Sequence, residues 1–92
     1  MNAKAKGTRN EYRSMALYET LGYEVIRSAA SLGVWDWIAW NKHELVFGQT
    51  KTGRWPGTDE MEAIELAVVP PNSRKVIHRW MPKKHKPDVR EV

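Results

Sequence analysis

The chain of 92 residues contains no cysteine. This absence excludes a disulfide framework, a thiolate metal site and a cysteine nucleophile. The chain also lacks a long uninterrupted apolar run and a secretory signal at its start, so we expect neither a membrane-spanning helix nor export. We therefore expect a soluble protein that acts in the cytoplasm, as a microbial or viral protein inside a cell.

Acidic residues are fewer than basic ones, with 11 Asp and Glu against 15 Lys and Arg and a net charge of +4. The charges are unevenly placed. Residues 1–13 and 74–92 are strongly basic, whereas residues 59–73 contain only acidic charges. Two basic ends favour a polyanion such as nucleic acid as the partner. The alternative is that the basic ends serve only solubility.

Aromatic residues are abundant for a chain of this length, with five Trp, three Tyr and one Phe. A chain this short buries only about two-thirds of the surface that its extended form exposes. The aromatic side chains can therefore fill a small core or cover an interface. We expect one domain over residues 1–92, with a loose basic arm at 1–7 and a basic, proline-containing tail at 82–92.

The first helix is predicted from its ends and its spacing. A hydroxyl at Thr8 followed by Glu11 matches the capping box, in which both side chains bond to backbone N–H groups of the first turn. Apolar residues then recur at helical spacing as far as Leu21, and Gly22 is a typical C-terminal stop. These signals predict a helix over residues 9–21.

The remaining elements follow from strand-forming residues and turn signals. The predicted strands are 23–28, 34–40, 45 to 51 or 52, and 74–81, and a second helix begins at Thr58 or Asp59 and ends before Pro70. The order is a helix, a three-stranded meander, a helix and a strand. This order predicts a single small α/β domain with a mixed central sheet.

One carboxylate interrupts the apolar stretch 34–40. Aspartate is depleted in strands and is rarely buried without a partner, since an unpaired buried charge costs several kcal/mol. Asp36 therefore requires a cation, a metal ion or a catalytic lysine as its partner. Lys51, in the next predicted strand, is the nearest candidate.

The hairpin between these two strands sets which side chains meet. If its turn centres on Lys42 and His43, Asp36 faces Gln49 and both project to the same side of the sheet. Lys51 shares that side by strand alternation, although a slip of one residue would reverse it. Such oxygen donors suit Mg²⁺ or Mn²⁺, and a lysine beside the metal can orient the attacking water or stabilise the phosphate. The alternative is a purely structural Asp36–Lys51 ion pair.

Four stretches, taken together in order and spacing, resemble the archaeal-type Holliday junction resolvases. They are Gly7–Glu11, Val25–Ser31, Asp36 and Gln49–Lys51. These resolvases belong to the PD-(D/E)xK superfamily of restriction-endonuclease-like nucleases. The resemblance covers residues 6–52. It implies a restriction-endonuclease-like fold, a magnesium-dependent endonuclease in which Mn²⁺ can substitute, and a homodimer that cuts four-way DNA junctions by paired symmetric hydrolysis.

The resemblance also implies which residues carry the reaction. The family's glutamate of the first helix falls on Glu11, its aspartate on Asp36 and its lysine on Lys51, while Gln49 stands where the family has glutamate. Glu11, Asp36 and Gln49 would then hold the metal, and Lys51 would place water and phosphate. An amide oxygen can bind Mg²⁺ but lacks the negative charge, so affinity should fall unless another carboxylate compensates. For Glu11, the capping role remains the alternative.

Basic, hydroxyl and aromatic residues near these motifs are candidates for contacts with DNA. They are Lys4, Lys6, Arg9, Arg13, Arg27, Ser28, Ser31, Arg54 and Trp55. Trp55 can stack on a base or pack against the second helix, and His78 can pack or touch phosphate. The residues proposed for the dimer interface are Trp40, Leu45 and Trp80.

Three functions follow from these observations. The first is a nuclease that resolves Holliday junctions as a dimer. The second is a structure-specific or nicking nuclease that acts on forks, flaps or duplex ends. The third is a non-catalytic DNA-binding module in which Gln49 marks a degenerate site.

Overall fold

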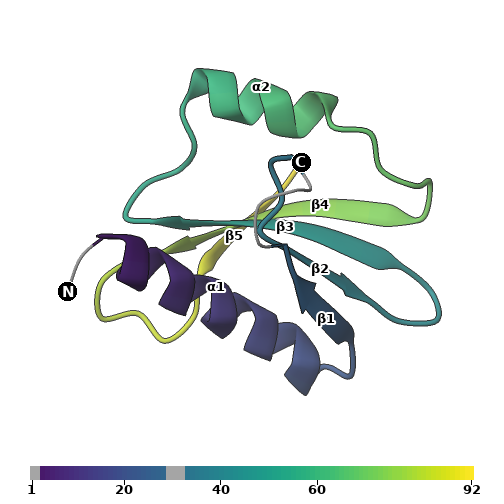
Figure 1. Ribbon diagram of the computed structural model, residues 1–92, viewed down its shortest axis with the longest axis horizontal. Helices are drawn as coiled ribbons and strands as arrows, with labels where there is room; N and C mark the ends of the chain where they lie inside the picture. The colour runs from purple at the N-terminus through teal and green to yellow at the C-terminus, as the bar shows by residue number, and fades with distance from the viewer. Residues whose placement is uncertain (1–2, 29–32) are drawn as a thin grey trace.

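A five-stranded mixed sheet lies between two helices, with α1 on one face and α2 on the other (Figure 1). The computed structural model describes residues 3–28 and 33–92. In chain order the elements are α1 (Ala3–Thr20), β1 (Glu24–Arg27), β2 (Trp37–Trp40), β3 (Leu45–Thr52), α2 (Thr58–Leu66), β4 (Ser73–Trp80) and β5 (Asp88–Glu91). The predicted α/β class and mixed sheet are confirmed.

The strands lie in sequence order across the sheet, β1-β2-β3-β4-β5. Among the described strands, only β3 and β4 are parallel neighbours, because the chain crosses over through α2 between them. The hairpin of β2 and β3 has the predicted register, with Trp40 opposite Leu45 and Trp37 opposite Gly48. The β2 strand is shorter than predicted, so Asp36 directly precedes it. In the parallel pair, β3 and β4 end side by side, with Thr52 opposite Trp80.

The prediction of a loose N-terminal arm at 1–7 was wrong for residues 3–7, which form the first turns of α1. Alanine and lysine have high helix propensity, so the helix extends back beyond the predicted start. Thr8 and Glu11 consequently lie inside the helix and cannot form a capping box at its start. The predicted end at Leu21 is close to the observed end at Thr20, and Gly22 has the positive φ of 91° expected of a helix stop.

The basic segment 82–92, predicted as a tail, contains a strand that was not predicted. Residues 88–91 form β5, which pairs antiparallel with β4 and places Val76 opposite Glu91. The lysine-rich segment between the two strands is therefore a hairpin loop whose two ends are both anchored in the sheet. The strand β5 has four residues, of which three are charged, and so short a stretch shows no periodicity that would predict it from the sequence.

The second helix begins at Thr58, as predicted, but its cap position is Gly57, which offers no side-chain hydrogen bond. It ends at Leu66, earlier than expected. Of its apolar residues, Ile64 is fully buried, whereas Val68 lies beyond the helix and is 96 % exposed. Neither helix in the described ranges is long and apolar enough to cross a membrane.

The core is divided between the two faces of the sheet. On the α1 face, buried side chains from the helix and the sheet form one cluster: Met15, Tyr18, Trp37, Ala39, Val46 and Val76. On the α2 face, the buried cluster consists of Trp35, Ile64 and Ile77, with Phe47 and Trp55 packed against it. This arrangement leaves the end of β3 with Gln49 and Lys51 on the side of α2.

Candidate active site

Asp36 lies at the entry to β2 and is held through its backbone and its carboxylate. Its N–H donates to the carbonyl of Gly48 at 2.8 Å, and its carbonyl accepts the N–H of Ser28 at 2.8 Å. Its Oδ2 accepts the N–H of Thr50 at 2.7 Å. Asp36 was predicted to require a cation, a metal ion or a lysine, whereas the hydrogen-bond donor to its carboxylate in the described residues is a backbone N–H of β3.

The pKa of the Asp36 carboxyl is raised to about 6, mainly by burial and to a smaller extent by the nearby carboxylates of Glu11 and Glu60. The N–H of Thr50 and the charge of Lys51 act in the opposite direction and lower the pKa. The carboxylate therefore lies among charged groups of both signs, in a position where an added cation would favour its ionised form.

A buried polar network holds the Thr50 hydroxyl behind this carboxylate. The Trp37 indole donates to Thr50 Oγ1 at 3.0 Å, and Thr50 Oγ1 donates to Ser14 Oγ at 3.4 Å. Ser14 also accepts the indole N–H of Trp80 at 2.8 Å and lies 2.9 Å from His78 Nδ1. Since both lone pairs of Ser14 are then used, its hydroxyl proton points to His78 Nδ1.

His78 was predicted either to pack in the core or to contact a phosphate, and this network distinguishes the two roles. The ring is only 2 % exposed, so the side chain packs in the core. Burial lowers its pKa to about 4, and the neutral ring accepts the proton of Ser14. His78 is therefore a structural residue of the core on the α1 face.

Gln49 is 6 % exposed and faces α2. Its Nε2 donates to the carbonyl of Val34 at 3.1 Å and lies 3.5 Å from Glu60 Oε2. Its Oε1 is buried and, in the part of the chain that the structure describes, accepts no hydrogen bond. A buried oxygen without a donor requires an explanation, and an ordered water or a bound cation would supply one.

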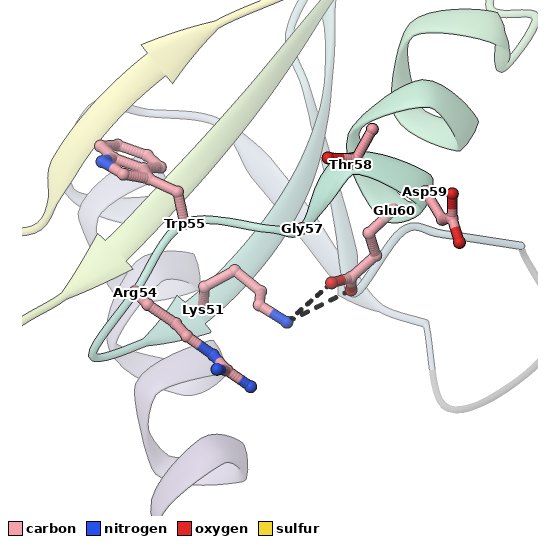
Figure 2. Close-up of a pocket in the computed structure, with 7 residues that line it drawn as sticks. All are labelled: Lys51, Arg54, Trp55, Gly57, Thr58, Asp59 and Glu60. Carbon is pink, nitrogen blue, oxygen red and sulfur yellow. Dashed lines mark hydrogen bonds and ion pairs between the residues drawn. The ribbon is translucent and has the colours of Figure 1, made fainter.

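Lys51 forms an ion pair with Glu60 from the first turn of α2, with Nζ 3.0 Å from Oε1 and 3.3 Å from Oε2 (Figure 2). Within the described residues, Lys51 pairs with Glu60 and not with Asp36, so the predicted structural Asp36–Lys51 ion pair was wrong. Glu60 was not predicted as a site residue, because it belongs to a helix whose position over the sheet the sequence does not give. Only the placement of α2 over β3 brings it to Lys51.

Glu11 projects from the middle of α1, where its Oε1 accepts the Nε–H of Arg27 on β1 at 2.9 Å. The structure excludes the capping role for Glu11, since its helix begins at Ala3. Its effect on the pKa of Asp36 places the two carboxylates in the same electrostatic environment. Its role in metal binding stays a prediction.

A pocket of about 560 Å³ opens beside the Lys51–Glu60 pair and is bounded by the loop that leads into α2. Figure 2 shows the Arg54 side chain on the same side of this loop as Lys51, whereas the Trp55 ring points the other way. Trp55 packs on the core cluster beneath α2, with the guanidinium groups of Arg79 and Arg90 4.6 and 4.4 Å from its centroid. This packing against the second helix is one of the two predicted roles of Trp55.

The other candidate DNA contacts are dispersed. Arg9 is exposed on α1, and Ser28 precedes the loop, its Oγ buried and without a hydrogen bond to any described group. Ser31 lies outside the described residues. Lys4 and Lys6 lie on the first turns of α1, and the structure describes only their backbone.

The donor set can be tested for a divalent cation. No group of three or more His, Cys, Asp or Glu side chains in the described ranges is arranged to hold a metal. Mg²⁺, however, commonly keeps several waters and uses one or two carboxylates from the protein. The Asp36 carboxylate, the unpaired Gln49 Oε1 and the Glu60 carboxylate are oxygen donors of this kind. The residues therefore fit an ion with few protein ligands.

No family model and no curated protein matches this sequence. A search of solved structures finds Hjc, a Holliday junction resolvase from the archaeal hyperthermophile Archaeoglobus fulgidus, with a TM-score of 0.70 and 20 % sequence identity. The match covers 94 % of this chain and 70 % of Hjc. At this identity the likeness concerns the fold alone. The chain therefore has the fold of an archaeal Holliday junction resolvase.

Proposed function

We propose that this protein is a metal-dependent DNA endonuclease that resolves four-way junctions by paired symmetric hydrolysis of phosphodiesters. The observation that carries the proposal is the placement of Asp36, Gln49 and Lys51 around the end of β3, in a fold shared with a Holliday junction resolvase. The basic charge of the chain is complementary to the DNA backbone.

Asp36 and Gln49 would hold Mg²⁺ or Mn²⁺, with Glu11 as the third predicted ligand. When bound, the cation would neutralise charge on the phosphate and lower the pKa of a coordinated water. The Thr50 N–H and the network behind it orient the Asp36 carboxylate before any substrate arrives. An already ordered ligand avoids part of the entropic cost of assembling the site.

Glu60 is the carboxylate that would compensate for the missing charge at Gln49. It already lies within hydrogen-bonding distance of both Gln49 and Lys51. Lys51, with its side chain only partly exposed, keeps its amine beside these oxygens and would donate to a phosphate oxygen or orient the attacking water. Exchanging Gln49 for Glu should therefore tighten Mn²⁺ binding, and Glu60→Gln should weaken it, as measured by calorimetry without DNA.

Paired cuts require two active sites, which a twofold dimer supplies. The sheet surface of β1 and β2 beside α2 supports such an arrangement, because Ile26 is 54 % and Trp40 is 39 % exposed there. Trp80, predicted as an interface residue, is 2 % exposed and belongs to the core, so that prediction was wrong. Sedimentation of wild type and of Ile26→Ser/Trp40→Ser would test the interface, and a monomeric wild type with junction DNA would overturn it.

Cleavage of a labelled four-way junction and of a matched linear duplex tests the proposal directly. Wild type should introduce symmetric nicks in the junction in Mg²⁺ and in Mn²⁺, and Asp36→Asn should bind the junction without cutting it. Cleavage of forks or flaps in preference to junctions would favour the alternative of a structure-specific or nicking nuclease that acts on forks, flaps or duplex ends. Tight binding by wild type without any product in either metal would favour the non-catalytic DNA-binding module. The uncharged Gln49, in place of a glutamate, is the observation that supports this alternative.

A further inference from the structure

The loop between β4 and β5 gathers positive charge at one point of the surface. Residues 81–87 read Met-Pro-Lys-Lys-His-Lys-Pro and contain no acidic residue. Lys83, Lys84 and Lys86 are all exposed. Since β5 pairs along β4, both ends of the loop are anchored and its charges cannot disperse as they would on a free tail.

Helix α1 holds this loop in place through Arg13. The Arg13 guanidinium lies 3.9 Å from the centroid of the Trp80 ring and donates to the carbonyl of Lys84 at 3.0 Å and to Asn10 Oδ1 at 3.1 Å. These contacts fix the guanidinium without neutralising it, because none of its partners carries a negative charge.

The contrast with other cations of the protein is informative. Lys51, Arg27 and Arg79 each form an ion pair with a carboxylate. In the described part of the chain, no ion pair involves five of the cations of α1 and the loop. These five are Arg9, Arg13, Lys83, Lys84 and Lys86. Unneutralised cations that are held close together repel one another, and an anion between them relieves that repulsion.

A cavity of about 260 Å³ lies between α1 and the start of the loop, bounded by Arg9, Arg13, Lys83 and the Trp80 ring. We call it the α1–loop groove. Figure 1 shows the loop beside the first half of α1. The groove adjoins the end of β3 that carries Lys51. Gly53, which directly follows β3, donates its N–H to the carbonyl of Trp80 at 2.9 Å, and Trp80 lines the groove.

A second contact ties the groove to the site. Asn10 Nδ2 donates to Thr52 Oγ1 at 2.8 Å, and Thr52 follows Lys51 on β3. The groove and Lys51 therefore lie at the same end of the two parallel strands. A DNA backbone that places one phosphate at Lys51 would continue past this end, where further phosphates need cationic partners.

We propose that the α1–loop groove and the lysines of residues 83–86 bind backbone phosphates of DNA next to the phosphate that is cut. The inference rests on the proposed nuclease function and assigns a role to the C-terminal hairpin. Phosphate contacts position a protein on DNA and carry no sequence information, so this surface sets the register of the substrate in the site.

Junction binding without metal tests the proposal, because no cleavage then occurs. Lys83→Gln/Lys84→Gln/Lys86→Gln should weaken binding by roughly 10- to 100-fold near 100 mM salt and lower the slope of log affinity against log salt by about two to three. Lys42→Gln is the control for a single exposed lysine. Lys42 lies in the β2–β3 turn, roughly 25 Å along β3 from the groove, and this variant should bind DNA like wild type. Lys86→Gln, by contrast, should lower the slope of log affinity against log salt by about one.

A second measurement uses the absence of cysteine, which makes any introduced cysteine unique. Lys86→Cys carrying a photo-crosslinker should attach to junction DNA, and Lys42→Cys should not. A triple glutamine variant with wild-type affinity and slope, or equal crosslinking from both positions, would overturn this inference alone. Failure of wild type to bind any junction would overturn the nuclease proposal and this inference together.

Discussion

The two faces of the sheet differ in how completely they are covered. On the α1 face, the 18-residue helix packs on aromatic and aliphatic side chains, and the polar groups of Ser14 and His78 bond to each other inside the core. On the α2 face, a helix of nine residues covers only part of the sheet. Gln49 and Lys51 lie on this face, and Lys51 lines a pocket there.

Helix length explains the difference. At about 1.5 Å per residue, α1 spans about 27 Å and α2 about half of that, so the shorter helix buries one large residue, Ile64, and leaves Ile26 and Trp40 exposed. The α1 face therefore holds the larger buried cluster, and the incompletely covered α2 face is where the proposed substrate and second subunit would lie. The following changes test this division, from the largest expected effect to the smallest.

Lys51→Met should lower junction cleavage by roughly 100- to 1000-fold, about what the loss of one group that stabilises transition-state charge costs. Its unfolding midpoint should stay close to that of wild type, because the ion pair with Glu60 is partly exposed and contributes little to stability. Single-turnover cleavage and urea unfolding measure the two effects. Unchanged cleavage would remove Lys51 from the reaction.

Gly48→Ala should destabilise the protein by about 3 kcal/mol, since a Cβ there would collide with the buried Trp37 ring. Glycine in β3 gives the indole the space to lie across the sheet. Gly57→Ala is the matched control, because a Cβ at Gly57 meets nothing within 4 Å. Equal urea midpoints for the two variants would contradict the tight packing assigned to the α1 face.

Ser14→Ala should cost about 2–3 kcal/mol of unfolding free energy. The substitution removes the acceptor of the Trp80 indole and the partner of His78 Nδ1, which leaves buried polar groups unsatisfied. Thr20→Ala provides a control on the exposed end of the same helix, where the hydroxyl bonds to the carbonyl of Ala16. A loss no larger than that of the control would show that the network contributes little.

The pH dependence of stability should show the separate contributions of His78, in the core of the α1 face, and of Asp36, in the candidate site. The pKa of His78 falls on folding from 6.5 to about 4, so protonation of the unfolded state lowers stability as the pH falls through this range. The pKa of Asp36 rises on folding from 3.8 to about 6, so protonation of the folded state raises stability over nearly the same range. The two effects oppose each other in wild type.

Asp36→Asn removes one of these effects. The variant should be more stable than wild type at pH 7 and should lose on the order of 2 kcal/mol of stability between pH 6.5 and 4.5, where wild type changes less. Urea unfolding without divalent cations measures both curves. Parallel curves for the two proteins would contradict the opposed pKa shifts.

The meander and its register were predictable because local signals agreed. Alternation in β3, the turn after Trp40 and the apolar run before it all favour one pairing, and the structure has that pairing. The N-terminal turns of α1 were missed because a capping motif at Thr8 outweighed the helix propensity of the residues before it. The strand β5 was missed because four residues carry too little periodicity, and its stability comes from pairing with β4.

By itself, the sequence determined the fold class and predicted Asp36, Gln49 and Lys51 as a set of candidate site residues, through residue type and spacing along the chain. Only the tertiary structure decided their partners. Glu60 reaches Lys51 because α2 crosses over β3, and the loop lysines reach α1 because β5 returns along β4. Strand periodicity acts over a few residues, whereas contacts between distant segments depend on how whole elements pack, which local patterns do not encode.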